Sequence, residues 1–186
     1  MKLYKITFRR FFKKYLAEIG YQDRVLDFAC ADAKFISLFD CSYYCGLDYD
    51  EGRIKFAKSR FPGEDYAFFQ MDFLTDPVPV PEKFNLCVCT HTLSHIEEKD
   101  HQFVINKLSK CVEDGFLIIH LPSRYFSTFK FLQKNFDVMQ SVRYGGKLSH
   151  FFSLTGIDRV LPDLLLKGFS YLDYGADEAI FLIKIK

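Results

Sequence analysis

The fold can be read outward from the stretch Val25-Leu26-Asp27-Phe28-Ala29-Cys30-Ala31-Asp32-Ala33, an apolar run that ends at an acid and passes into a loop of small residues. Residues 24–28 have the composition of a buried strand, and residues 34–39 have the spacing of a helix. A second strand at 43–47 is followed by a second helical pattern at 52–60. This alternation of apolar strands with helices predicts a parallel sheet that is covered by helices on both faces.

The same alternation continues along the rest of the chain. We expect strands at 66–71, 84–89 and 115–121, the last stopped by Pro122, and helices at 97–112 and 156–166. Two strands at 168–174 and 178–184, joined by a tight turn at Gly175, should close the sheet as an antiparallel pair. The pattern predicts an α/β fold with one doubly wound, mostly parallel sheet that ends in an antiparallel strand, formed by a single domain of residues 1–186.

Residues 1–20 are predicted to form an N-terminal amphipathic helix. Apolar side chains at positions 4, 8, 11, 12, 15 and 19 fall on one helical face. Such a helix either packs on the domain with its charged face in solvent, or binds anionic lipid or nucleic acid. The net charge of +1 argues against a strongly polyanion-binding protein. The basic residues, most of them on the opposite face, are Lys2, Lys5, Arg9, Arg10, Lys13 and Lys14.

Composition places the chain among globular proteins. Hydrophobic residues make up 49% and charged residues 26% of 186 residues, enough for one domain with a substantial core. The six cysteines lack the paired short spacings of a zinc site, so we expect reduced thiols in the core and no metal. Because neither a signal peptide nor a run of about 18 apolar residues is visible, we expect a cytoplasmic protein without a transmembrane segment.

Two acids mark the expected binding site. Ligands of open α/β sheets bind beyond the carboxyl ends of the strands, beside the first strand, where the loop after Asp27 lies. Asp48 follows Asp27 by 21 residues and ends the second strand. An acid at that position can accept hydrogen bonds from both hydroxyls of a ribose, so the spacing predicts a ligand that contains ribose.

These features resemble the class I S-adenosylmethionine-dependent methyltransferase family, in its small-molecule branch. The family's first motif is a hydrophobic pair, an acid, any residue and then small-x-Gly-x-Gly. Residues 25–33 follow this frame with alanines at 29, 31 and 33, which makes the glycine loop degenerate. Later landmarks follow in the family's order: Asp48, Met71-Asp72-Phe73, the fourth motif at 84–96, the loop and fifth strand at 112–122, and the closing segment at 150–154 with Gly168-Phe169.

The resemblance implies a seven-stranded Rossmann-like methyltransferase fold and methyl transfer from the cofactor S-adenosylmethionine to a small-molecule acceptor that the sequence does not identify. Eight residues correspond to positions around the cofactor in this family. They are Asp27, Ala29, Ala31, Asp48, Tyr49, Asp72, Phe73 and Thr90.

The alanines in the loop bear on activity. Replacing glycine with alanine costs about 1 kcal/mol or more where φ is positive, and nothing comparable where φ is negative. The sequence leaves both conformations open. An alternative function is therefore a catalytically inactive methyltransferase-fold protein that binds a ligand or serves as a scaffold for a partner protein.

Histidines are the candidates for a general base, which would help if the acceptor is a hydroxyl. His95 is the candidate catalytic residue because it matches a position where the family often has histidine, and His91 and His150 are further candidates. His95 can instead be a hydrogen-bonded residue at the start of the helix that follows. The aromatic run at 125–129 is either a lid over the substrate or a helix packed into the core.

Two other classes of function are less favoured. Families that methylate nucleic-acid amino groups place Asp/Asn/Ser-Pro-Pro-aromatic after the fourth strand, whereas this chain has Cys89-Thr90-His91-Thr92. RNA methylation through the basic N-terminal helix stays open. A nicotinamide-dependent enzyme needs Gly-x-Gly-x-x-Gly after the first strand, and no glycine occurs between Gly20 and Gly46.

Overall fold

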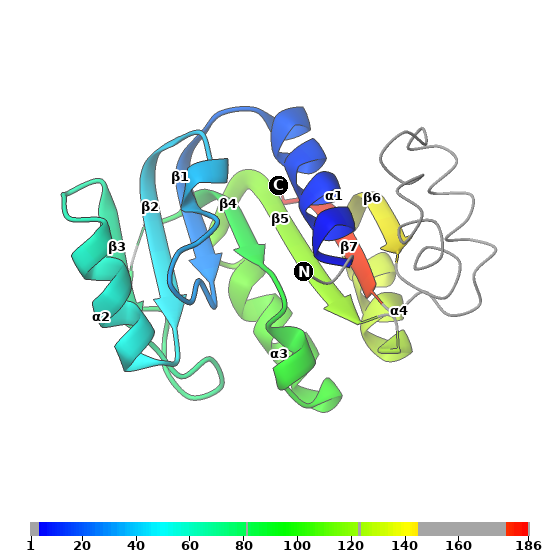
Figure 1. Ribbon diagram of the computed structural model, residues 1–186. Coiled ribbons are helices and arrows are strands. Elements are labelled where there is room, and N and C mark those ends of the chain that lie inside the picture. Colours follow the sequence, from blue (N-terminus) through cyan, green and yellow to red (C-terminus); the bar gives the residue numbers. More distant parts are fainter. Residues whose placement is uncertain (1–3, 81, 123, 145–177, 186) are drawn as a thin grey trace.

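A seven-stranded sheet runs through the computed structural model, with strand order β3-β2-β1-β4-β5-β7-β6 (Figure 1). The structure describes residues 4–80, 82–122, 124–144 and 178–185. Strands β1 to β5 pair in parallel, and β7 pairs antiparallel with both β5 and β6, which confirms the expected fold class. The strands are β1 (Gln22–Phe28), β2 (Cys41–Asp48), β3 (Tyr66–Gln70), β4 (Phe84–Cys89), β5 (Val112–Pro122), β6 (Asp137–Tyr144) and β7 (Glu178–Lys184).

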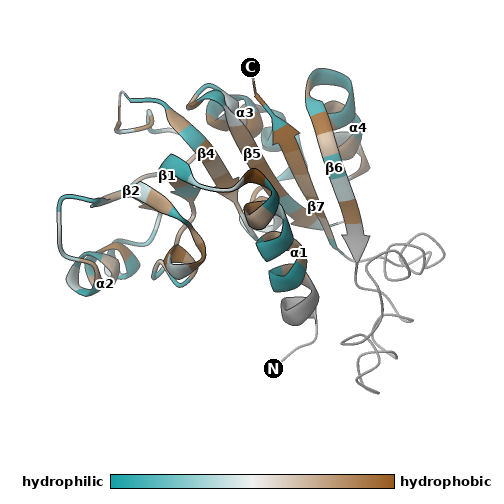
Figure 2. Cartoon of the chain, turned by 90° about the horizontal axis from the view of Figure 1, so that it is seen from above, coloured by the Kyte–Doolittle hydropathy of each residue, from teal (hydrophilic) through white to brown (hydrophobic). Residues whose placement is uncertain are grey.

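Helices cover both faces of the sheet. Figure 2 shows α1 on one face and α3 and α4 on the other. The buried side chains of α2 belong to the same cluster as those of α1. None of the helices in the described part of the chain has the length and apolar character needed to cross a membrane. The α-helices are α1 (Tyr4–Ile19), α2 (Glu51–Arg60), α3 (Glu98–Ser109) and α4 (Phe126–Asn135), and the 3-10 helices are η1 (Ile36–Leu38) and η2 (Leu93–His95).

The central strands carry buried apolar residues on both faces because each strand contributes to two cores. Successive side chains of a strand point to opposite faces of the sheet. In β4, Leu86 and Val88 pack in the cluster with α1 and α2, whereas Cys87 and Cys89 pack in the cluster with α3 and α4. All six cysteines carry free thiols, and those at 30, 45, 87 and 89 are buried, in agreement with the expected core thiols.

The N-terminal helix packs by its predicted apolar face. Phe8, Phe11, Phe12 and Tyr15 are at most 2% exposed. They join the core that the first strands and α2 share, and the ring of Phe12 meets those of loop residues after β1. This packing fixes α1 across one end of the sheet and leaves its basic side chains at the surface.

Several element predictions need correction. The helix predicted at 34–39 is wrong: residues 29–35 form turns and only Ile36–Leu38 make one 3-10 turn. Helix α3 ends at Ser109 and β5 already starts at Val112, because the chain pairs with β4 from there. Strand β6 was not predicted. It lies at the edge of the sheet, so its sequence mixes polar and apolar residues, of which Val142 is buried.

The C-terminal predictions are settled only in part. The strand predicted at 178–184 is β7. The helix predicted at 156–166, the strand at 168–174 and the turn at Gly175 lie outside the described residues. The aromatic run at 125–129 enters α4, where Phe129 is 5% exposed and its ring lies 4.9 Å from that of Phe181. Phe129 therefore packs into the core, whereas Phe126 is 64% exposed.

Candidate functional site

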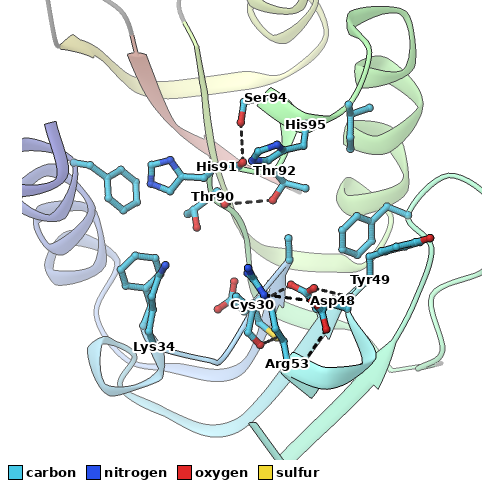
Figure 3. Close-up of a pocket in the computed structure, with 18 of the residues that line it drawn as sticks. Cys30, Lys34, Asp48, Tyr49, Arg53, Thr90, His91, Thr92, Ser94 and His95 are labelled. Carbon is cyan, nitrogen blue, oxygen red and sulfur yellow. Dashed lines mark hydrogen bonds and ion pairs between the residues drawn. The ribbon is translucent and has the colours of Figure 1, made fainter. Parts of the chain in front are cut away.

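A cavity of about 1290 Å³ opens beyond the carboxyl ends of β1, β2 and β4 (Figure 3). It lies at the edge of the sheet where a ligand is expected, beside the first strand. The structure brings all eight predicted cofactor residues together in its lining, and His95 lies there as well. The eight are Asp27, Ala29, Ala31, Asp48, Tyr49, Asp72, Phe73 and Thr90.

The loop after β1 keeps a glycine-type backbone without glycines. The φ angles of Ala29, Ala31 and Ala33 are 65°, 52° and 53°, all in the left-handed region that side chains with a Cβ disfavour. Ala29 and Ala31 line the cavity, whereas Ala33 is fully buried in the core. The loop therefore adopts the costly conformation, and two of its three alanines line the cavity.

Hydrogen bonds to β2 hold this loop in place. Asp48 Oδ2 accepts from the backbone N–H of Ala31 at 2.8 Å, and its Oδ1 accepts from that of Asp50 at 2.9 Å. The backbone N–H of Cys30 donates to Leu47 O at 2.9 Å. A carboxylate offers about four acceptor positions, so Asp48 retains capacity for the hydroxyls of a ligand.

Asp27 is an acid in the floor of the cavity. Its side chain is 2% exposed, and Tyr44 Oη donates a hydrogen bond to Oδ2 at 2.6 Å. Burial raises the pKa of Asp27 to about 7, while the Tyr44 hydrogen bond and Lys34 lower it and Asp48 raises it further. Asp27 therefore titrates near neutral pH, where a nearby ligand cation would favour its charged form.

The end of the cavity that is formed by the loops after β2 and β3 is aromatic. The ring of Phe73 lies 4.0 Å from that of Phe28, and Tyr49 stands at the rim with 66% of its surface exposed. Lys107 Nζ donates to Phe73 O at 2.8 Å and to Asp76 O at 2.9 Å, which fixes the loop after β3. Lys107 could not be singled out from the sequence, because a lysine in an amphipathic helix is usually solvated.

Two histidines lie with Phe8 in a group of tilted, edge-on rings near α1. The ring of His91 lies 4.7 Å from that of Phe8 and 4.1 Å from that of His120, and its own backbone is left-handed, with φ 61°. The backbone N–H of His91 donates to His120 Nδ1 at 3.2 Å, so Nε2 carries the proton of the neutral His120 ring.

Glu178 is a cavity residue that the sequence did not indicate. His120 is 1% exposed, and its Nε2 lies 3.2 Å from Glu178 Oε2, an ion-pair contact without the alignment of a hydrogen bond. Antiparallel pairing places Glu178 opposite Pro122, at the end of β5. The only sequence signal for Glu178 was its position as the first residue of the strand predicted at 178–184.

His95 lies at the exposed rim of the cavity, at the end of η2. The segment around it is held by buried His101, whose Nε2 is 2.8 Å from Leu93 O and whose Nδ1 is 2.9 Å from Thr128 Oγ1. His101 is thus a structural residue, and sequence reasoning missed it inside a predicted helix. His150, the third candidate base, lies outside the described residues, as do the landmarks at 150–154 and Gly168-Phe169.

Comparisons with known proteins agree with this geometry. Residues 25–115 match a family model described as a methyltransferase domain. No curated protein sequence matches the chain significantly. The N-methyltransferase NodS from Bradyrhizobium japonicum WM9, in complex with S-adenosyl-L-homocysteine, is 14% identical with a TM-score of 0.67, over 96% of this chain and 87% of that one.

Two further solved structures share the fold. The magnesium protoporphyrin IX methyltransferase ChlM from Synechocystis PCC 6803, with bound S-adenosylmethionine, is 14% identical with a TM-score of 0.66, over 98% of this chain and 80% of that one. The [4+2]-cyclase SpnF is 15% identical with a TM-score of 0.61, over 93% of this chain and 80% of that one. At these identities the likeness establishes the fold alone.

Replacing Ala31 with glycine should stabilise the protein, because φ is 52° and the side chain is only partly buried. We expect a gain of about 0.5–1 kcal/mol in the free energy of unfolding, measured by urea denaturation. Ala33→Gly should change the free energy of unfolding little. Relief of the left-handed φ angle is offset there by the loss of a buried methyl group, which costs about 0.8 kcal/mol. Ala57→Gly, at a buried position of α2, should destabilise by about 1 kcal/mol or more. A loss for Ala31→Gly as large as that for Ala57→Gly would contradict the left-handed loop.

Replacing Asp27 with asparagine should make stability less dependent on pH. The pKa of Asp27 rises from 3.8 to about 7 on folding, so the folded state holds a proton that the unfolded state has released between these values. The free energy of unfolding of the native protein should therefore fall as pH rises from about 4 to 7 and level off above.

Asp27→Asn keeps an acceptor for the Tyr44 hydroxyl and removes the loss of stability that ionisation of the buried carboxyl causes. We expect it to stabilise the protein by roughly 2–4 kcal/mol at pH 8 and by much less at pH 4.5, in urea denaturation at both values. Asp65→Asn, at an exposed acid, should change stability by less than about 0.5 kcal/mol. Equal effects of Asp27→Asn at the two pH values would show that the carboxyl is not desolvated.

Proposed function

We propose that the chain is a member of the class I S-adenosylmethionine-dependent methyltransferase family, that it binds S-adenosylmethionine and that it transfers the methyl group to a small-molecule acceptor. The observation that carries the proposal is the convergence of eight motif positions, far apart in sequence, on one cavity beside β1.

Each part of the cofactor has a residue of suitable chemistry. Asp48 would accept hydrogen bonds from the ribose hydroxyls, and Tyr49 and Phe73 would contact the adenine. Asp27 would lie near the methionine ammonium, whose charge would favour the ionised carboxylate. Asp72, Thr90 and the backbone of the loop at Ala29 and Ala31 complete the proposed contacts.

The loop geometry supports a fit. Ala31 has a left-handed backbone, the conformation that glycine adopts without a steric cost, and Ala33 is buried in the core and does not line the cavity. Only the methyl groups of Ala29 and Ala31 would approach the ligand. The bound cofactor supplies an electrophilic sulfonium methyl group, and the protein's part is to align the acceptor and exclude water.

His95 is the proposed general base. It lines the cavity from η2, and its exposed ring can take a proton from an acceptor and release it to solvent. Glu178 is the second group that could take this part, because its carboxylate reaches the cavity and is held by His120.

A catalytically inactive binding or scaffold protein is the second candidate function. Three left-handed alanines in the loop favour it, because a chain under selection for tight cofactor contact would gain from glycine at these positions. The fold itself does not decide between the two functions, since function depends on the site and not on the architecture.

Calorimetric titration with S-adenosylmethionine and S-adenosylhomocysteine tests the proposal, with NAD as the control ligand. We expect micromolar dissociation constants, about −8 kcal/mol, for the first two and no heat for NAD. Tyr49→Ala should weaken S-adenosylhomocysteine binding about tenfold through lost ring contact. Phe56→Ala is the matched control, because Phe56 is 54% exposed on α2 and outside the cavity lining. Absence of heat and of thermal stabilisation at millimolar ligand would refute the cofactor proposal.

His95→Gln separates catalysis from binding. In an assay that follows S-adenosylhomocysteine release over a panel of hydroxyl and amine acceptors, we expect about 10²-fold lower turnover and a changed pH profile. Affinity for S-adenosylhomocysteine should stay within about twofold, since His95 lies outside the proposed cofactor contacts. Unchanged turnover in His95→Gln, with loss in Glu178→Gln, would move the role of base to Glu178.

A further inference from the structure

The wall of the cavity between β4 and α3 has little regular structure of its own. Among residues 90–97, all of which the structure describes, only η2 is helical, as a single 3-10 turn. The backbone N–H of His95 donates to Thr92 O at 2.9 Å, and that of Ile96 donates to Leu93 O at 3.3 Å. Figure 3 shows Thr92 and His95 on this segment. So short a turn is held weakly by its own hydrogen bonds, and its position depends on contacts from other elements.

The imidazole of His101 ties both ends of this turn. Its Nε2 lies 2.8 Å from Leu93 O and 3.1 Å from Ile96 O, the carbonyls on either side of Ser94 and His95. A carbonyl oxygen can only accept, so Nε2 carries a hydrogen that the two carbonyls share. His101 is fully buried in the first turn of α3, and helix side chains lean toward the helix N-terminus, which is where η2 lies.

Helix α4 holds the other nitrogen of this ring. The Oγ1 atom of Thr128, a buried residue, lies 2.9 Å from His101 Nδ1. The ring of Tyr125 stands edge-on to the imidazole, with the two centroids 4.7 Å apart. Glu98 Oε1 accepts hydrogen bonds from the backbone N–H and the hydroxyl of Ser127, which joins the starts of α3 and α4. The imidazole therefore cannot turn without losing contacts to two elements, and η2 is tied through it to α4.

The consequence of this arrangement falls on His95. Its side chain is exposed at the rim of the cavity, so core packing does not fix the ring, and the backbone of η2 decides where it lies. A displacement of about 1 Å in a reacting group can lower a rate about 10²-fold. A general base on a short turn therefore needs that turn to be held from outside, and His101 holds it at both ends.

We propose that His101 is a positioning residue, which fixes η2 so that His95 stays where it can take a proton from the acceptor. This inference rests on the proposed methyltransferase function, in which His95 is the general base, and it adds a second residue on which that step depends. An imidazole suits the place because it has a nitrogen on each side of the ring and can bridge η2 and α4. A leucine of similar size would leave the Ile96 carbonyl and the Thr128 hydroxyl without the contacts that His101 provides.

A double-mutant cycle between His101 and His95 tests the proposal, with turnover followed as S-adenosylhomocysteine release. We expect His101→Leu alone to lower turnover about tenfold or more, and to lower it by less than about twofold when added to His95→Gln. Affinity for S-adenosylhomocysteine should stay within about threefold of that of the native protein, because the proposed cofactor contacts lie outside η2. Effects of the two changes that simply multiply would show that His101 supports the fold alone, and would overturn the proposal.

Further variants separate positioning from stability. His101→Gln keeps a side-chain N–H that can donate to η2, so its turnover should exceed that of His101→Leu by about threefold or more. Leu108→Ala, at a buried site in the last turn of α3, is the matched control: it should lower the thermal midpoint at least as much as His101→Leu and keep turnover within about twofold of native. Equal losses of turnover in these two variants would overturn the proposal. If His101→Leu does not fold, Thr128→Val takes its place in the cycle, because it removes only the hydroxyl beside Nδ1.

Amide hydrogen exchange gives a readout that needs no acceptor. The N–H groups of His95 and Ile96 should exchange about tenfold faster or more in His101→Leu, and at the native rate in Leu108→Ala. Unchanged exchange in His101→Leu would overturn the proposal whether or not the protein transfers methyl groups. A native protein that shows this exchange pattern but no methyl transfer would refute the proposed function, and with it the part of His101 in proton transfer. An active native protein in which the cycle shows independent effects would refute this inference alone.

Discussion

The hydrogen bond from the backbone N–H of Ala31 to Asp48 Oδ2, 2.8 Å long, joins the loop after β1 to the end of β2, and the form of the cavity depends on it. This hydrogen bond stabilises the left-handed conformation of Ala31, which a residue with a Cβ otherwise disfavours. Gly46 makes this close approach of loop and strand feasible, since a Cβ there would lie 2.7 Å from Cys30 Sγ. A loop that lacks glycines thus depends on a glycine in the neighbouring strand.

Burial around this loop sets the chemistry of the cavity. Asp27 lies beside the loop with its carboxyl removed from water, and its pKa of about 7 leaves it poised between two charge states. The protein accepts a cost in stability by placing an ionisable group there. Such a cost is typical of groups that act on a ligand, because their partner charge is absent until the ligand arrives.

Helix α1 joins the core and the cavity. Its aromatic face is part of the hydrophobic cluster with α2, and its basic residues form the rim of the cavity. The alternatives left open for this helix, a packed helix or a polyanion-binding one, are therefore not exclusive: it packs, and its charged side chains line the cavity. In the fold's solved relatives the same architecture serves methyltransferases and a cyclase, so the identity of the rim side chains, and not the sheet, must define the ligand.

The sequence by itself determined the parallel strands β1 to β5, the helices α1, α2 and α3, and the placing of Asp27 and Asp48 at strand ends, because periodicity and strand endings are local properties of the chain. Through the order of the motifs that resemble the family, it also indicated the eight predicted cofactor residues, which all line the cavity. It failed at residues 34–39, where a helical spacing yields to the turns of a loop tied to β2, and at the edge strand β6.

Only the tertiary structure decided the φ angles of the three alanines, because Asp48 and Leu47 accept hydrogen bonds from the backbone N–H groups of Ala31 and Cys30 and so hold the loop. It alone brought Glu178 to His120, since β7 pairs with β5 across a separation of more than fifty residues. Local sequence carries no record of such pairings, and for that reason the place of Glu178 in the cavity and the basic rim became apparent only in the folded chain.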